Sequence, residues 1–174
     1  MSKPSVTKLT AMLDKPKLLD WANKLGLSGI TLSSARKLNF TKGTSIHKEI
    51  EMFLKNGECF SNKETQKKAE KLFNQFNIIG VEVSVENKYF KGRYDIKIEK
   101  GGIEYICDFK TGHKRHYLEN YLQLSAYRMA DDCDRVAIIS VPEFTMFDLG
   151  IEDYEPYEQI MINLSNIYNI KELL

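Results

Sequence analysis

The strongest constraint on the fold is a change in hydrophobic period after residue 80. Over 81–86 every second residue is apolar, which is typical of a strand with one buried face. A second strand is predicted over 89–98, and Gly101-Gly102 indicates a tight turn into a third strand over 103–110. The middle of the chain is therefore predicted to be a three-stranded meander. On its second strand, one face is predicted to carry Tyr94, Ile96 and Ile98, and the other Asp95, Lys97 and Glu99.

An acid and a base lie two residues apart in the third strand. Because strand side chains alternate between faces, Cys107 and Phe109 are predicted to enter a core while Asp108 and Lys110 project from the other side. Antiparallel pairing across the turn is expected to bring Asp95 close to Asp108. Facing carboxylates repel each other unless a divalent cation lies between them, and Mg²⁺ prefers such oxygen ligands. Two interpretations follow: a structural ion pair, or a metal ligand beside a lysine that handles a nucleophile or a phosphate.

The remaining segments are predicted to be mostly helical. Helices are expected over 16–25, 43–54, 62–76 and 117–130 and from 155 onward, with a connector over 28–40. An apolar run over 135–141 predicts a strand buried on both sides, followed by an edge strand over 144–149. Length favours a single domain over 1–174. We divide it into a helical N-terminal extension (1–42), a core (43–141) and a C-terminal strand and helix (142–174).

Charge and cysteine content narrow the function classes. The net charge of +1 provides no overall basic field, so any contact with nucleic acid must come from a local patch. The three cysteines form no CxxC pair, which argues against a zinc knuckle or an iron–sulfur cluster and for reduced thiols. Neither a signal peptide nor an apolar run of about 20 residues is visible, so a cytoplasmic protein is expected.

Four motifs follow one another in the chain: Gly43-x-x-x-His47, Gly92-x-x-Asp95, Asp108-Phe109-Lys110-Thr111 and Gln123-Leu124-x-x-Tyr127. On these motifs the chain resembles the PD-(D/E)XK nucleases of the RecB-type exonuclease branch, and is similar to small phage and CRISPR-adaptation nucleases. The resemblance covers roughly 43–141 and implies an α/β fold with a restriction-endonuclease-like mixed β-sheet flanked by α-helices. Tyr94 stands where the family name has a proline. No helicase motif is present, so any motor is expected to be a separate chain.

The resemblance also implies roles for individual residues. It implies Mg²⁺ or Mn²⁺, without an iron–sulfur cluster, held by His47, Asp95, Asp108 and the backbone carbonyl of Phe109. Lys110 would orient or deprotonate the attacking water. Gln123 and Tyr127 would support that lysine and the substrate strand. Two further acids, Glu51 and Glu82, are candidates to lie just behind the metal ligands.

The function implied is a metal-dependent DNA exonuclease in DNA repair, recombination or phage DNA processing, in a bacterial or phage-infected cell. Its partner would be single-stranded DNA or a duplex end, contacted by the basic loop at Lys114 and Arg115. A homo-oligomer or a separate helicase or recombination partner is also compatible with the sequence. The alternatives are a structure-specific endonuclease or junction resolvase, and a non-catalytic nucleic-acid-binding protein with the same fold.

Overall fold

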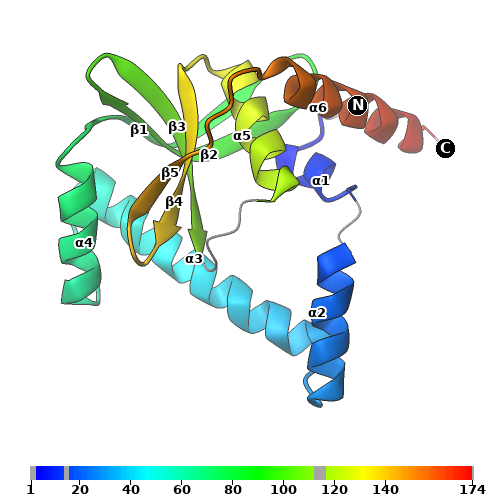
Figure 1. Cartoon of the computed structure of the whole chain (residues 1–174), viewed down its shortest axis with the longest axis horizontal. Coiled ribbons are helices and arrows are strands. Elements are labelled where there is room, and N and C mark those ends of the chain that lie inside the picture. Colours follow the sequence, from blue (N-terminus) through cyan, green and yellow to red (C-terminus); the bar gives the residue numbers. More distant parts are fainter. Residues whose placement is uncertain (1–2, 14–15, 112–116, 174) are drawn as a thin grey trace.

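The computed structural model describes residues 3–13, 16–111 and 117–173 and contains six helices and five strands within them (Figure 1). The helices are α1 (Val6–Thr10), α2 (Pro16–Leu27), α3 (Leu32–Asn56), α4 (Lys63–Phe73), α5 (Leu118–Ala130) and α6 (Glu155–Lys171). The strands are β1 (Asn77–Glu86), β2 (Lys91–Lys100), β3 (Ile103–Thr111), β4 (Arg135–Val141) and β5 (Thr145–Asp148). Across these residues, no helix combines the length and apolar character needed to cross a membrane.

The five strands form one mixed sheet in the order β1-β2-β3-β4-β5. β1, β2 and β3 are antiparallel neighbours, which confirms the predicted meander, and Gly101 and Gly102 both adopt positive φ in the turn between β2 and β3. After α5 the chain returns parallel to β3 as β4, and β5 pairs antiparallel at the edge. The fold is therefore α/β, a mixed sheet flanked by helices, as expected for a restriction-endonuclease-like architecture.

A hydrophobic core lies on each face of the sheet. On one face, α1, α5 and α6 cover a cluster that includes Val6, Leu122 and Met161. On the other, α3 and α4 cover a cluster that includes Ile50 and Phe73, and Figure 1 shows the long α3 crossing beneath the strands. Both faces are buried, which explains the unbroken apolar run over 136–139 in β4.

The alternation predicted for the third strand is confirmed, but that for the second strand is wrong at one residue. Cys107 and Phe109 pack into the core under α3 and α4, whereas Tyr94 packs against α5 and not with Ile96 and Ile98. The β2–β3 ladder ends where Ile96 pairs with Cys107. The regular alternation of faces is lost just beyond this pair, and the Tyr94 hydroxyl donates a hydrogen bond to Asp131 Oδ2 at 2.5 Å.

The connector predicted over 28–40 is wrong over most of its length, because residues 32–40 belong to α3. Thr31 caps the helix, its hydroxyl accepting a hydrogen bond from the Ser34 N–H at 3.2 Å, and α3 then continues without a break to Asn56. Gly57 ends it in the left-handed conformation, with φ of 71°. Serine and threonine are weak helix formers, which suggested a loop, but here they supply the cap.

Candidate active site

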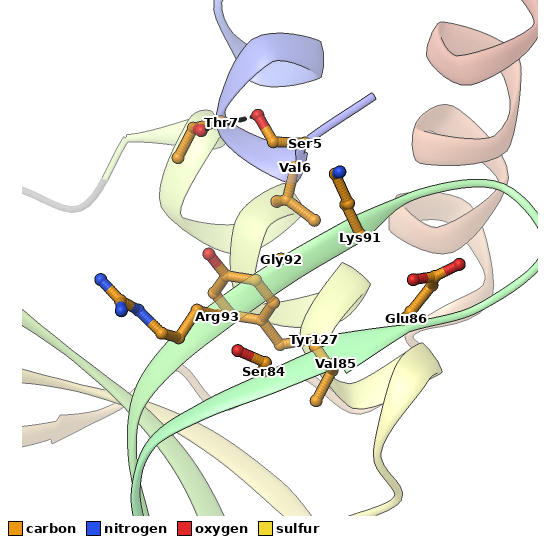
Figure 2. A pocket seen from close by; sticks show the side chains of 10 residues that line it. All are labelled: Ser5, Val6, Thr7, Ser84, Val85, Glu86, Lys91, Gly92, Arg93 and Tyr127. Atoms are coloured by element: carbon orange, nitrogen blue, oxygen red, sulfur yellow. Dashed lines mark hydrogen bonds between the residues drawn. The ribbon is translucent and has the colours of Figure 1, made fainter. Parts of the chain in front are cut away.

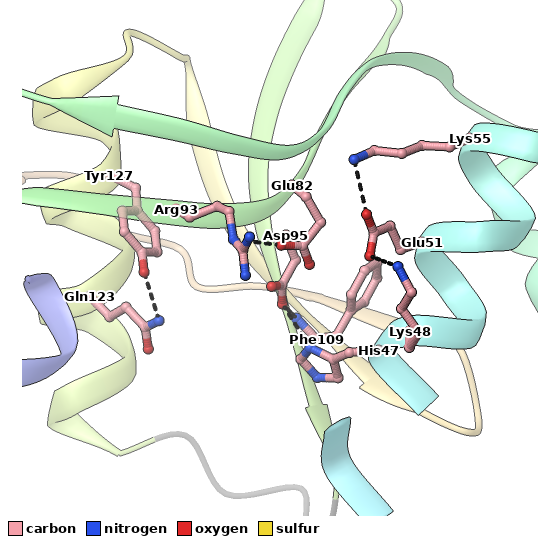
Figure 3. Close-up of polar contacts among 10 residues, drawn as sticks. All are labelled: His47, Lys48, Glu51, Lys55, Glu82, Arg93, Asp95, Phe109, Gln123 and Tyr127. Carbon is pink, nitrogen blue, oxygen red and sulfur yellow. Dashed lines mark hydrogen bonds and ion pairs between the residues drawn. The ribbon is translucent and has the colours of Figure 1, made fainter. Parts of the chain in front are cut away.

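One open cavity of about 570 Å³ lies where α3 and α5 approach the neighbouring parts of β2 and β3. Every predicted catalytic, metal-ligating or supporting residue that the structure describes lines it. These residues are His47, Glu51, Glu82, Asp95, Asp108, Phe109, Lys110, Gln123 and Tyr127. Figure 3 shows most of them converging from α3, β1, β2 and α5. The sequence motifs are thus brought to one place, although they span more than seventy residues of chain.

The two aspartates form a strained electrostatic pair. The β2–β3 ladder ends where Ile96 pairs with Cys107, and the next residue of each strand, Asp95 and Asp108, lines the cavity. Asp95 Oδ2 accepts a hydrogen bond from the Phe109 N–H at 2.6 Å, which ties it to the backbone of β3. Burial raises the pKa of Asp95 well above its usual range, and the charge of Asp108 raises it further. A proton or a cation therefore stabilises this pair of carboxylates.

His47 reaches the same carboxylates from the middle of α3. Its Nδ1 lies 3.7 Å from Asp95 Oδ2, and its ring packs edge-on against Phe109 with the ring centroids 5.7 Å apart. Burial lowers the pKa of His47 below its usual value, although the charge of Asp108 opposes this. A neutral imidazole is the form that binds metal ions.

A chain of polar contacts links Asp108 to α5. Lys110 Nζ lies 2.6 Å from Asp108 Oδ2 and donates a hydrogen bond to Gln123 Oε1 at 3.2 Å. The Gln123 amide nitrogen in turn donates to Asp108 Oδ1 and to the Tyr127 hydroxyl, each at 3.1 Å. One glutamine therefore sets the positions of an acid, a base and a phenol. Burial raises the pKa of Tyr127, which keeps its hydroxyl protonated.

The two further acids are both held by cations. Glu82 lies in β1 with φ of 55°, a left-handed conformation that is unfavourable for a side-chain-bearing residue, and Arg93 Nε lies 2.7 Å from its Oε2. Glu51 accepts hydrogen bonds from Lys48 at 3.0 Å and Lys55 at 3.1 Å, which lower its pKa. Figure 3 places Glu82 beside Asp95 and Glu51 further along α3.

The donor atoms suit a divalent cation. No three His, Cys, Asp or Glu side chains within the described ranges are drawn together as a ready-made metal cage, and Asp108 is engaged by Lys110. However, Asp108 Oδ2 is buried and accepts no hydrogen bond from the described part of the chain, so the ammonium supplies charge without a well-aligned donor. Two carboxylates, a neutral imidazole and a nearby carbonyl are a ligand set that Mg²⁺ and Mn²⁺ accept.

Sequence reasoning missed Arg93 and Lys48, which also line the cavity. Arg93 had a signal, since it lies two residues before Asp95 in the same strand and such residues share a face. Lys48 directly follows His47 on an otherwise ordinary helix face and had none. The predicted DNA contacts at Lys114 and Arg115 lie outside the described residues.

Comparisons with known proteins give only distant similarities. No protein-family model and no curated protein matches the sequence. The solved structure of SSO0001 is 17% identical with a TM-score of 0.48, and the match covers 95% of this chain and 76% of that one. A phage-related exonuclease from Haemophilus somnus 129PT is 15% identical with a TM-score of 0.44, covering 99% and 97%. The function below therefore rests on the geometry of the site.

Proposed function

We propose that this chain is a DNA nuclease that hydrolyses phosphodiester bonds with Mg²⁺ or Mn²⁺, acting as an exonuclease. One observation carries the proposal: two mutually repelling carboxylates, the partly buried Asp95 and the buried Asp108, share a cavity with a histidine and a lysine. Such a pair costs stability in the folded chain, and a conflict of this kind is expected where function requires it. Hydrolysis of a phosphodiester by this route uses a cation and an activated water, and these residues suit the binding of both.

His47, Asp95, Asp108 and the carbonyl of Phe109 would hold the cation. When bound, the cation acts as a Lewis acid on the phosphoryl oxygen and makes its own water more acidic. Holding Asp95 against the Phe109 N–H fixes one carboxylate before any cation arrives, so little reorganisation is needed.

Lys110 supplies the remaining charge. Its side chain is 39% exposed and can turn from Asp108 toward the cavity. There the ammonium would orient the attacking water or offset the charge that develops on the phosphate, whereas the neutral amine would take the proton of that water. Gln123 contacts both Asp108 and Lys110, so it would keep the two at a fixed spacing. Tyr127 holds that glutamine from the far side and is a positioning residue.

The test is cleavage of end-labelled DNA with Mg²⁺, with Mn²⁺ and with EDTA. We expect cleavage of linear DNA that EDTA abolishes and that Asp108→Asn removes. Asp20→Asn on the exposed surface of α2 serves as the matched control and should leave the rate unchanged. Metal-independent cleavage, or full activity in Asp108→Asn, would contradict the proposal.

Closed circular DNA tests the exonuclease assignment separately. An exonuclease needs an end, so circles should survive conditions that degrade linear strands of the same sequence. Cut circles would identify an endonuclease instead. Binding without any cleavage would identify a non-catalytic DNA-binding protein.

A further inference from the structure

A second groove continues directly from the active-site cavity. It lies between α1 and the β1–β2 hairpin, has a volume of about 650 Å³, and is shown in Figure 2. Thr7, Arg93 and Tyr127 line both hollows, so the two are joined along one surface. None of the proposed metal ligands or Lys110 lines this second groove, which therefore has no assigned role.

The lining of the groove combines cations, hydroxyls, an apolar floor and one carboxylate, Glu86, which is paired with Lys3 at 2.5 Å. Lys91 and Arg93 stand along β2, and their side chains are exposed. Ser5 and Thr7 lie on the opposite wall with their hydroxyl oxygens 3.1 Å apart. The floor comprises the Tyr127 ring, Val6 and Val85. Tyr127 and Val6 are buried, so the floor supports the walls of the groove, whereas the two cations are open to solvent. A positively charged groove that follows the phosphate backbone is typical of single-strand binding.

The floor depends on a close approach that only glycine allows. A Cβ at Gly92 would lie 2.6 Å from Tyr127 Cε1 and 3.2 Å from Val6 Cγ2. Any side chain at this position would displace the ring, which also contacts Gln123 in the active site. A substitution at Gly92 is therefore expected to change both the shape of the groove and the position of Gln123.

Arg93 stands where the two hollows meet. Its Nε is paired with Glu82, which leaves the two terminal guanidinium nitrogens without a partner in the part of the chain that the structure describes. The Arg93 side chain is 64% exposed, so a phosphate can approach its guanidinium group directly from solvent. An arginine suits this contact, because its planar fork matches two phosphate oxygens.

We propose that the groove between α1 and the β1–β2 hairpin binds the backbone of a single DNA strand next to the phosphate to be cleaved, with Arg93 on the phosphate at the junction and Lys91 on a phosphate further along. This rests on the proposed nuclease function and specifies its substrate. The volume is that of a pocket for a ligand of drug size, typically about 300–1,000 Å³, which is enough for a short stretch of one strand.

Binding is measured by fluorescence anisotropy in EDTA, where metal-dependent cleavage cannot interfere, over a range of salt concentrations. We expect Arg93→Gln and Lys91→Gln each to weaken binding of a labelled single strand roughly three- to tenfold. Each should also reduce the slope of log affinity against log salt by about 0.7, the value for one lost phosphate contact on a single strand. Glu82→Gln should do the opposite and strengthen binding, because it releases Arg93 from its acidic partner.

Lys88→Gln is the matched control. Lys88 lies in the same hairpin with its ammonium 4.7 Å from the Tyr89 ring centroid, outside both hollows. It should change affinity and salt slope far less than the two groove variants. Melting temperatures of all four variants verify that each is folded.

Equal effects of Lys88→Gln and Arg93→Gln would overturn the groove assignment, as would wild-type protein that binds no single strand. The choice of a single strand would be overturned if a duplex of the same length bound as tightly as the single strand and lost as much affinity in Lys91→Gln. Cleavage separates this proposal from the one it rests on. If the wild type cleaves DNA but the groove variants bind normally, the groove fails and the nuclease stands; if the groove variants lose binding but nothing is cleaved, the nuclease fails.

Discussion

Lys110 separates the two interpretations of the acid–base pair in β3. Its ammonium lies 2.6 Å from Asp108 Oδ2 and also donates to Gln123. If the pair is only structural, Lys110 stabilises the fold and nothing else. If it is catalytic, Lys110→Met removes the charge, keeps the hydrophobic stem, and must affect stability, metal binding and cleavage in three different ways.

The magnitudes follow from the exposure of the pair. Removing one partner of a fully buried ion pair costs about 3–5 kcal/mol, but 39% of the Lys110 side chain is exposed against 7% for Asp108. Solvent screening reduces the expected cost without metal to about 1–2 kcal/mol, a melting temperature lower by roughly 3–6 °C. Because Lys110 competes with a cation for Asp108, its loss should raise Mn²⁺ affinity, by up to roughly tenfold. Cleavage should nevertheless fall by about 10²–10⁴, as for other lost acid–base groups.

Three measurements cover these quantities: calorimetric titration of Mn²⁺, single-turnover cleavage, and thermal unfolding in EDTA. Lys88→Met, at an exposed position in the turn between β1 and β2, controls for the loss of a positive charge. Wild-type cleavage by Lys110→Met would refute the reasoning, since the pair would then be structural and the mechanism wrong even for a nuclease. Weaker Mn²⁺ binding would refute the assignment of Lys110 as a competitor of the metal.

Three further predictions concern the proposed metal ligands. The pKa of Asp95 is raised in the folded state. Without metal, ionisation of Asp95 should therefore lower the stability of the fold as the pH rises from about 4, the pKa in the unfolded chain, toward the raised pKa in the folded chain. Asp95→Asn should flatten the resulting fall of melting temperature with pH, and an unchanged slope would contradict the burial of that carboxylate. His47→Ala should weaken the affinity for Mn²⁺ measured by calorimetry, so part of the lost cleavage rate should return at high Mn²⁺ concentration. A cleavage rate that no Mn²⁺ concentration restores would exclude His47 as a metal ligand. Asp108→Ala should lose metal binding and cleavage together, while circular dichroism shows that the protein is folded. Without metal this variant should be more stable than the wild type, because the repulsion with Asp95 is relieved. An unfolded variant would favour the interpretation of Asp108 and Lys110 as a structural ion pair.

Local pattern alone determined much of the sheet and the pairing of the two aspartates. Alternating apolar residues define strands, and a Gly-Gly turn of fixed length sets how β2 and β3 pair. Once that register is set, Asp95 must lie near Asp108, because both positions are counted from the same turn. The family resemblance carried by the four motifs likewise predicted residues that line the cavity.

Only the tertiary structure decided what lies opposite each of these positions. Periodicity states which side of its own element a residue occupies, but not which other element packs there. Tyr94 therefore packs against α5 and departs from the predicted alternation, and residues 32–40 of the predicted connector form the start of α3, capped at Thr31. The groove beside the active site depends on Thr7 and Tyr127, which are 120 residues apart in the chain and share no local signal. Contacts of this range arise only when the layers pack, because burial of apolar surface acts between elements and not along them.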